Sequence, residues 1–273
     1  MKLGVNVPNF GPGTDPGLLR GWARIVEGLG YDLLMVSDHV VITPDVAKQY
    51  PAPFYEPFTT LSWLAGSTTT LRLGTTVLVL PYRHPLLVAR MATDLNQLSG
   101  GRFVLGVGIG WARQEFDALG VPFAERGRLT DEHLASLRQA WREEAEQQHT
   151  TPVPVWVGGN SETAIRRAIR FGDAWHPLRG TLPWLRSAVT SHSLPGFAPR
   201  IALRLTTEPV QDPDRPAGVG TLEQILDDLD QLRQLGAETV LLDPYNGDPE
   251  ETRRPEAAWR ALTAVATHWR TPS

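Results

Sequence analysis

The chain alternates between short apolar runs and longer segments in which apolar residues recur three and four positions apart. Short apolar or β-branched runs predict strands, and the longer spacing predicts amphipathic helices. The expected strands are residues 3–7, 33–37, 71–79, 103–108, 155–157, 174–176, 201–205 and 240–242. The expected helices are residues 16–29, 58–68, 85–98, 131–147, 162–171, 222–235 and 257–269. Residues 177–199 show no clear pattern.

This alternation predicts a parallel sheet, since no Asn-Gly or Asp-Gly pair joins two strand-like runs. A doubly wound sheet is the competing fold. Eight repeats that fill the whole chain favour closure into a (β/α)8 TIM barrel, which typically needs about 250 residues. We therefore expect residues 1–273 to form one barrel domain, with ligands bound beyond the carboxyl ends of the strands.

Composition argues against several classes of function. The net charge is −4 and no run of five basic residues occurs, so a nucleic-acid or anionic-membrane partner is not expected. The chain has no cysteine, which excludes disulfides and thiolate nucleophiles and fits a reducing cytoplasm. The N-terminal residues have no signal-peptide pattern, and no apolar run approaches the ~18 residues of a membrane span. We expect a cytoplasmic protein that acts on a small molecule.

The first candidate for chemistry is Asp38-His39, directly after the second expected strand. In a barrel this position opens into the active site, and histidine can exchange a proton near neutral pH. Asp38 could orient the imidazole or accept a hydrogen bond from a ligand. The alternative is a polar pair that only binds loop backbone.

Two further strand ends are rich in glycine. Gly106, Gly108 and Gly110 precede Trp111, and residues 158–161 run from two glycines into Asn-Ser and a helix. Such segments let backbone approach a ligand, and a helix N-terminus favours an anionic group. Trp111 stands where a dinucleotide fingerprint needs its last glycine, so that motif fails. The alternative to ligand binding is that the first glycines only allow a tightly packed turn, and that residues 158–161 only form a turn and the cap of the following helix.

Metal and glycosidase chemistry are not expected. His39, His84 and His176 form no short His-x-His pair, and no two glutamates follow expected strands. The segment of residues 73–81 could simply be a buried strand with polar residues at its end.

Taken together, these motifs resemble the bacterial-luciferase-like oxidoreductase superfamily, most closely its coenzyme F420-dependent branch. The matching segments follow the family order within residues 1 to about 180, and the C-terminal third matches only in general pattern. They are residues 36–39, 73–78, 99–102, 105–111, 156–159 and 172–177.

The resemblance implies that the ring of a flavin or deazaflavin lies over the third strand, with Asp38 at the ring edge and His39 as the catalytic residue. It implies cofactor contacts from Asp38, Thr76, Val77, Gly108, Ile109, Gly110, Gly158, Gly159, Asn160 and Ser161. The residues expected to line the substrate pocket are Trp63, Tyr82, Trp111 and His176. Family members carry a non-proline cis peptide in this strand, so we expect one between Thr76 and Val77.

The chain departs from the family at two places. Trp111 stands where the sugar-phosphate dehydrogenases of this branch have an acidic residue, which argues against that activity. The linker of residues 141–154 is short, so the roof of the pocket is expected to be reduced or to come from residues 40–56.

The function implied by the resemblance is hydride transfer between coenzyme F420 and a small organic substrate. The alternatives are a monooxygenase that uses reduced FMN and oxygen, and a non-catalytic flavin-binding protein. By the same resemblance we expect a homodimer formed by the helices after the second and third strands. Candidate contacts are Leu61, Leu64, Leu87 and Met91, although each could face the core.

Overall fold

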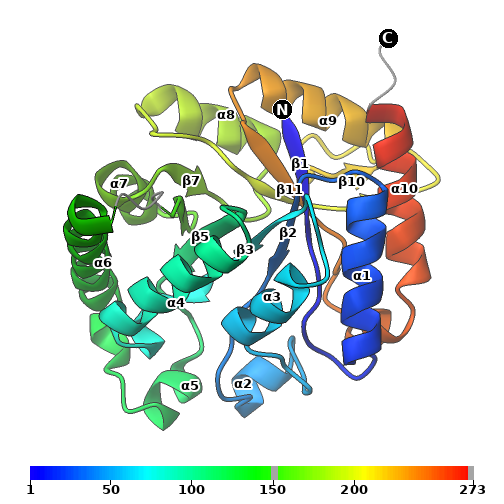
Figure 1. Cartoon of the computed structure of the whole chain (residues 1–273). Coiled ribbons are helices and arrows are strands. Elements are labelled where there is room, and N and C mark those ends of the chain that lie inside the picture. The colour runs from blue at the N-terminus through cyan, green and yellow to red at the C-terminus, as the bar shows by residue number, and fades with distance from the viewer. Residues whose placement is uncertain (149–152, 270–273) are drawn as a thin grey trace.

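Parallel strands follow one another around a barrel in the computed structural model, which describes residues 1–148 and 153–269 (Figure 1). In spatial order the strands are β7 (Ala174–His176), β6 (Val155–Gly158), β5 (Phe103–Gly108), β3 (Arg72–Thr75), β2 (Leu33–Val36), β1 (Lys2–Asn6), β11 (Thr239–Asp243) and β8 (Arg200–Ala202). Two isolated parallel bridges, Trp175 with Phe197 and Leu178 with Arg200, join the β7 side to the β8 side. The fold is the expected TIM barrel.

Helices surround the strands on the outside (Figure 1). They are α1 (Pro16–Gly28), α3 (Pro57–Ala65), α4 (Pro85–Leu98), α6 (Arg126–Gln148), α7 (Glu162–Phe171), α8 (Leu182–Ser191), α9 (Leu222–Gln234) and α10 (Glu256–Trp269). Shorter elements lie in the connections: α2 (Pro44–Ala47), α5 (Arg113–Ala118), η1 (Leu80–Tyr82), η2 (Phe123–Glu125), η3 (Pro249–Arg253), and the strands β4 (Leu78–Val79), β9 (Arg204–Leu205) and β10 (Val219–Gly220).

The core has two layers, because the strands bury both faces. The larger layer packs the strands against the helices. The smaller layer fills the inside of the barrel and consists of Leu33, Met35, Val104, Trp156, Ala174, Ala198 and Leu241. Gly106 allows β3 and β5 to approach inside it, since a Cβ there would lie 2.0 Å from the carbonyl oxygen of Thr75.

Most expected elements are confirmed, and the helix bounds 85–98 and 162–171 match those of α4 and α7. The expected strand of residues 71–79 is divided into β3 and β4, and the predicted cis peptide between Thr76 and Val77 lies at the division. The expected strand of residues 201–205 is likewise divided into β8 and β9.

Two helices differ from the expectation. α8 lies within the unassigned residues 177–199, where only Leu185 and Ala188 of its ten residues are buried, so its apolar periodicity is weak. α6 begins before the expected residue 131, at Arg126, whose guanidinium covers the Phe123 ring at 3.9 Å. The short linker expected at residues 141–154 lies partly outside the described residues.

The predicted dimer contacts divide into two groups. Leu61 and Leu64 are fully buried against the barrel, so the prediction that they form a contact surface is wrong. Leu87 is 54% exposed on α4 and Met91 is partly buried. Within the described residues, no helix combines the length and apolar character needed to span a membrane.

Candidate active site

A cavity of about 280 Å³ opens at the carboxyl ends of the barrel strands. Most of the residues predicted for the site line it: Asp38, His39, Thr76, Val77, Gly108, Ile109, Gly110, Trp111, Gly158, Gly159, Asn160 and His176. The structure adds residues that were not predicted individually: Ser37, Tyr50, Val79, Leu178 and Arg200. Ligand pockets at this end of a barrel are typical of enzymes with this fold.

Three predicted residues lie elsewhere. Trp63 is 41% exposed on α3, beneath the guanidinium of Arg20 at 5.2 Å, so its assignment to the substrate pocket is wrong. Tyr82 does not line the cavity, because its hydroxyl turns to the carboxylate of Glu115 at 3.0 Å. Ser161 caps α7 instead of lining the cavity, with its hydroxyl accepting from the N–H of Ala164.

His39 is paired with a buried glutamate that the sequence analysis missed. Its Nδ1 lies 2.6 Å from Oε2 of Glu115, on the helix α5 that follows the glycine run of β5. Glu115 is fully buried, and His39 retains 7% exposure at the cavity. An ionised carboxylate at Nδ1 fixes the tautomer with the proton on Nδ1, which leaves Nε2 for a ligand.

The charge of Glu115 is stabilised by several donors. Its carboxylate accepts from the backbone N–H groups of Val40 and Val41 as well as from Tyr82 and His39. Burial raises the pKa of Glu115, but the hydrogen bond and charge of His39 and the two backbone donors outweigh burial and lower it. Glu115 lies four residues after Trp111 but is fully buried and does not line the cavity, so it does not replace the acidic residue that is missing at Trp111.

Aromatic rings surround the imidazole. Tyr50 stacks on His39 with ring centroids 5.4 Å apart, and Phe54 and Trp111 meet it edge-on at 5.4 and 5.6 Å. Tyr50 and Phe54 come from residues 40–56, which were expected to supply the roof of the pocket. An apolar wall of this kind excludes water from the imidazole and suits a flat ligand.

Asp38 is engaged by the protein itself. Its two oxygens accept from Nη1 and Nη2 of Arg83 at 2.7 and 2.8 Å, and one also accepts from the N–H of Val79. Arg83 in turn binds Glu56 on the loop before α3. The fully buried Asp38 carboxylate thus joins the end of β2 to β4, and its predicted contact with a ring edge stays a prediction.

The floor of the cavity is the side chain of Val77. A Cβ added at Gly108 would lie 2.5 Å from Cγ2 of Val77, and one at Gly158 would lie 2.7 Å from its Cγ1. These two glycines therefore make room for Val77, in addition to exposing backbone to the cavity. Asn160 is also structural, since its amide both donates to and accepts from the backbone of Leu178.

A second polar cluster lies opposite His39. Arg200 donates to the buried carboxylate of Asp243 at 2.8 Å and to the carbonyl oxygen of Thr76 at 2.9 Å. The hydroxyl of Thr76 lies 2.9 Å from Nε2 of His176, whose Nδ1 is bonded to the carbonyl oxygen of Ala198. Burial, with a smaller effect of the Arg200 charge, lowers the pKa of His176 to about 4, so it is neutral at pH 7.

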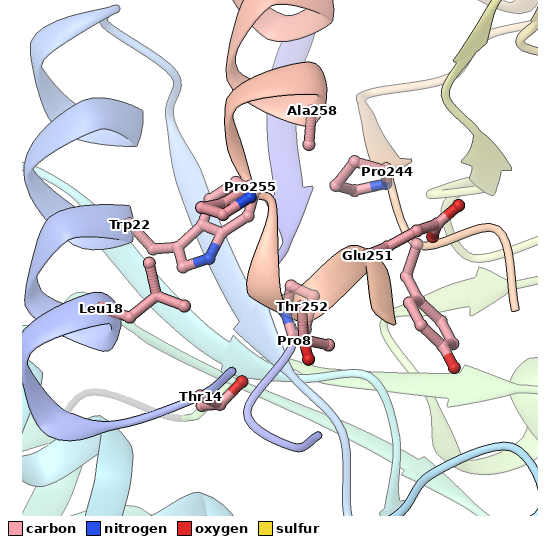
Figure 2. Close-up of a pocket in the computed structure, with 10 residues that line it drawn as sticks. Pro8, Thr14, Leu18, Trp22, Pro244, Glu251, Thr252, Pro255 and Ala258 are labelled. Atoms are coloured by element: carbon pink, nitrogen blue, oxygen red, sulfur yellow. The ribbon is translucent and has the colours of Figure 1, made fainter. Parts of the chain in front are cut away.

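A much smaller hollow of about 20 Å³ lies apart from this site, between α1, α10 and η3 (Figure 2). Trp22, Thr252 and Ala258 line it (Figure 2), and it has room for about one water molecule. Among the described residues, no three His, Asp or Glu side chains are grouped as metal ligands. The candidate site is therefore the larger cavity.

Comparison with known proteins identifies relatives of the chain. An uncharacterized protein of Mycobacterium tuberculosis is 32% identical over 180 residues, 56% of this chain and 62% of the relative. The F420-dependent glucose-6-phosphate dehydrogenase of Kineococcus radiotolerans is 31% identical over 200 residues, 64% of this chain and 56% of the relative. The chain thus spans about three-fifths of the length of these curated relatives.

Two solved structures show the same fold over 97% of both chains. They are the coenzyme F420-dependent tetrahydromethanopterin reductase of Methanopyrus kandleri, with a TM-score of 0.72 and 14% identity, and the oxygenating constituent of 3,6-diketocamphane monooxygenase of Pseudomonas putida in complex with FMN, with a TM-score of 0.71 and 16% identity. The family model for luciferase-like monooxygenases matches residues 1–204. The chain therefore belongs to the luciferase-like monooxygenase family.

Proposed function

We propose that the chain is an oxidoreductase that transfers a hydride between coenzyme F420 and a small organic substrate, with His39 as the residue that exchanges the accompanying proton. The observation that carries this proposal is the hydrogen bond from Nδ1 of His39 to buried Glu115 at the edge of the ligand cavity. Relatives that act with F420 support it, among them the Kineococcus enzyme.

The cavity fits the ring of such a cofactor. Val77 gives it a flat apolar floor, and the lining backbone of Gly108, Gly158 and Gly159 lets a ring and its chain approach closely. The N-terminal turn of α7, capped by Ser161, presents backbone N–H groups and a positive dipole end, which would favour an anionic tail. These residues and Asp38 would hold the cofactor.

The chemistry of the dyad matches a hydride reaction. When bound, the deazaflavin would supply or accept the hydride. A hydride added to a carbonyl carbon leaves negative charge on its oxygen. The imidazolium form of His39, which carries a proton on Nε2 as well as on Nδ1, can donate the Nε2 proton that this oxygen needs. In the reverse direction Nε2 takes the proton from the hydroxyl. Glu115 holds the imidazole in position and stabilises its positive charge in both cases.

A monooxygenase that uses reduced FMN and oxygen is the second candidate. The same cavity would hold an FMN ring, and the FMN-bound diketocamphane monooxygenase shares the fold. We prefer F420 because curated relatives of the chain act with it. The pair of His39 and Glu115 would serve either reaction, since the reduction of oxygen also takes up a proton.

Titration of the purified chain with F420 and with FMN tests the proposal. We expect reduced F420 to bind more tightly than FMN, as measured by fluorescence. Micromolar binding of FMN with no detectable binding of F420 would overturn the cofactor assignment. Binding of a cofactor without turnover of any alcohol, carbonyl or alkene substrate would favour the non-catalytic alternative.

We also propose that the active form is a homodimer formed by α4. Leu86 and Leu87 are both 54% exposed at the start of this helix, and Met91 lies one turn further along. Light scattering should then give twice the 30.1 kDa mass of the chain. Replacing both leucines by glutamate should give the monomer, and an unchanged mass would place the contact elsewhere.

A further inference from the structure

Two arginines share one buried carboxylate beside the cavity. Oδ2 of Asp243 accepts from Nε and Nη2 of Arg200 at 3.1 and 2.8 Å, and from Nε and Nη2 of Arg179 at 3.1 and 2.7 Å. Burial raises the pKa of Asp243, but the charges of Arg200 and Arg179 outweigh burial and lower it. Since arginine does not lose its proton in proteins, the cluster holds two positive charges and one negative charge.

Within the described residues, Asp243 is the only carboxylate within 4 Å of either arginine. The other acceptors of Arg200 are the neutral carbonyl and hydroxyl oxygens of Thr76, and His176 beside it is uncharged. Burial lowers the pKa of Arg179, but Asp243 and, to a smaller extent, Tyr50 and Glu251 outweigh burial and raise it. Among the described side chains, however, the ion pairs of Arg179 within 4 Å include Asp243 alone.

The fold keeps Arg179 at this place against a local cost. Its φ is 50°, in the left-handed region that L side chains rarely adopt, and no other non-glycine residue in the described part of the chain has a positive φ. Its guanidinium also donates to the carbonyl oxygen of Tyr245. Backbone conformations of this kind are unfavourable for L side chains and are concentrated at functional sites.

Of the two arginines, Arg200 faces the ligand. It lines the cavity and is only 9% exposed, so its guanidinium is poorly screened by water, whereas the Arg179 side chain is 37% exposed and supports Arg200 from outside the lining. Val77, Tyr50 and Trp111 line the same cavity and give it an apolar surface. A positive charge in a partly dehydrated site favours a negative charge on its ligand more strongly than it would in water.

We propose that Arg200, supported by Arg179, forms a binding subsite for an anionic oxygen carried by a planar ring, such as a phenolate or the ionised pyrimidinedione of a reduced flavin or deazaflavin. The inference rests on the proposed function in that the same cavity holds the ligand. It does not depend on which cofactor is used, because both cofactors and an aromatic substrate can carry such an oxygen.

The test uses 4-nitrophenol and the full chain without added cofactor. The phenolate absorbs visible light and the phenol does not, so a pH titration gives the pKa of the bound probe. We expect binding to lower this pKa by about 1–3 units, the range for an opposite charge within reach. Arg200→Gln should abolish the shift, and Arg200→Lys should keep part of it. Arg204→Gln, which removes an exposed arginine from β9, is the matched control and should leave the shift unchanged.

The outcomes separate this inference from the proposed function. No binding at millimolar probe, a raised pKa, or a shift that persists in Arg200→Gln would overturn the inference. Failure to bind F420 or FMN while the shift remains would overturn the proposed function alone. If a bound cofactor prevents the ionised probe from binding, the ring of the cofactor is the natural occupant; if the probe still binds as its anion, the substrate is.

Discussion

Two histidines line the same cavity, and their partners give them opposite properties. His39 has a buried carboxylate at Nδ1, whereas His176 has a backbone carbonyl at Nδ1, the hydroxyl of Thr76 at Nε2 and the charge of Arg200 nearby. The first arrangement stabilises an imidazolium when it forms, and the second penalises it. A histidine at a strand end is therefore not a proton donor by position alone.

The same contrast holds for the charged clusters behind the two imidazoles. Glu115 brings one negative charge to His39, and its remaining donors are neutral groups. Asp243 instead lies between two permanent cations. One side of the cavity can thus move a proton, and the other keeps a fixed positive charge.

The largest expected effect is on turnover and follows from removing the imidazole of His39. His39→Ala should lower turnover roughly 10²–10⁴-fold, because the general acid or base is lost, and should leave cofactor affinity close to wild type. Steady-state kinetics with F420 and a separate binding titration measure the two quantities. An equal loss of cofactor affinity would mean that His39 binds the cofactor instead.

The next effect concerns how much each of the two buried carboxylates contributes to the free energy of unfolding. Asp243→Asn should lower the free energy of unfolding by about 3–5 kcal/mol, because it leaves two arginines without their buried partner. Glu115→Gln should cost less, about 1–3 kcal/mol, because an amide oxygen still accepts from the neutral donors. Urea unfolding of both variants measures the difference, and equal losses would contradict a distinction between the clusters.

Acidification should reveal the neutral state of His176. Its pKa is about 4 in the fold against 6.5 when exposed, so below pH 6.5 the unfolded chain binds a proton that the native chain does not. Stability is therefore lost as the pH falls from 6.5 to 4, by up to roughly 3 kcal/mol from this group. Unfolding of wild type and His176→Gln at several pH values isolates this contribution. Parallel pH curves would show that folding does not lower the pKa of His176.

The smallest expected effect is on stability and concerns the packing of Val77, which forms the floor of the cavity. Gly108→Ala should destabilise the chain by about 1–3 kcal/mol, because the new Cβ would lie 2.5 Å from a methyl group of Val77. Val77→Ala removes that methyl group, so the double variant should be more stable than the sum of the single effects predicts. Additive losses would mean that Gly108 is needed for another reason.

Apolar periodicity was sufficient for the barrel, since each barrel strand is buried on both faces and each long helix on one. It was insufficient for α8, which buries few of its residues, and it could not divide the strand at Thr76, where only the family resemblance pointed to a cis bond. The strand ends were predicted as the site because all parallel strands present their carboxyl ends on one side.

The partners of the site residues were harder to predict. Glu115 lies 76 residues from His39 in a helix of mixed polar sequence, and the two meet because β2 and β5 both pair with β3. Arg200 and Asp243 likewise meet through the pairing of β8 with β11. A usable signal existed for Asp243 and Asn6, since each is a polar residue that ends an apolar strand.

The bonds of Glu115 also couple two parts of the site. The carboxylate holds Val40 and Val41, at the start of the segment that carries Tyr50 to the cavity, and it holds the preceding residue, His39. The orientation of the imidazole and the position of the aromatic wall beside it therefore depend on one and the same carboxylate, so a change at Glu115 would affect both together.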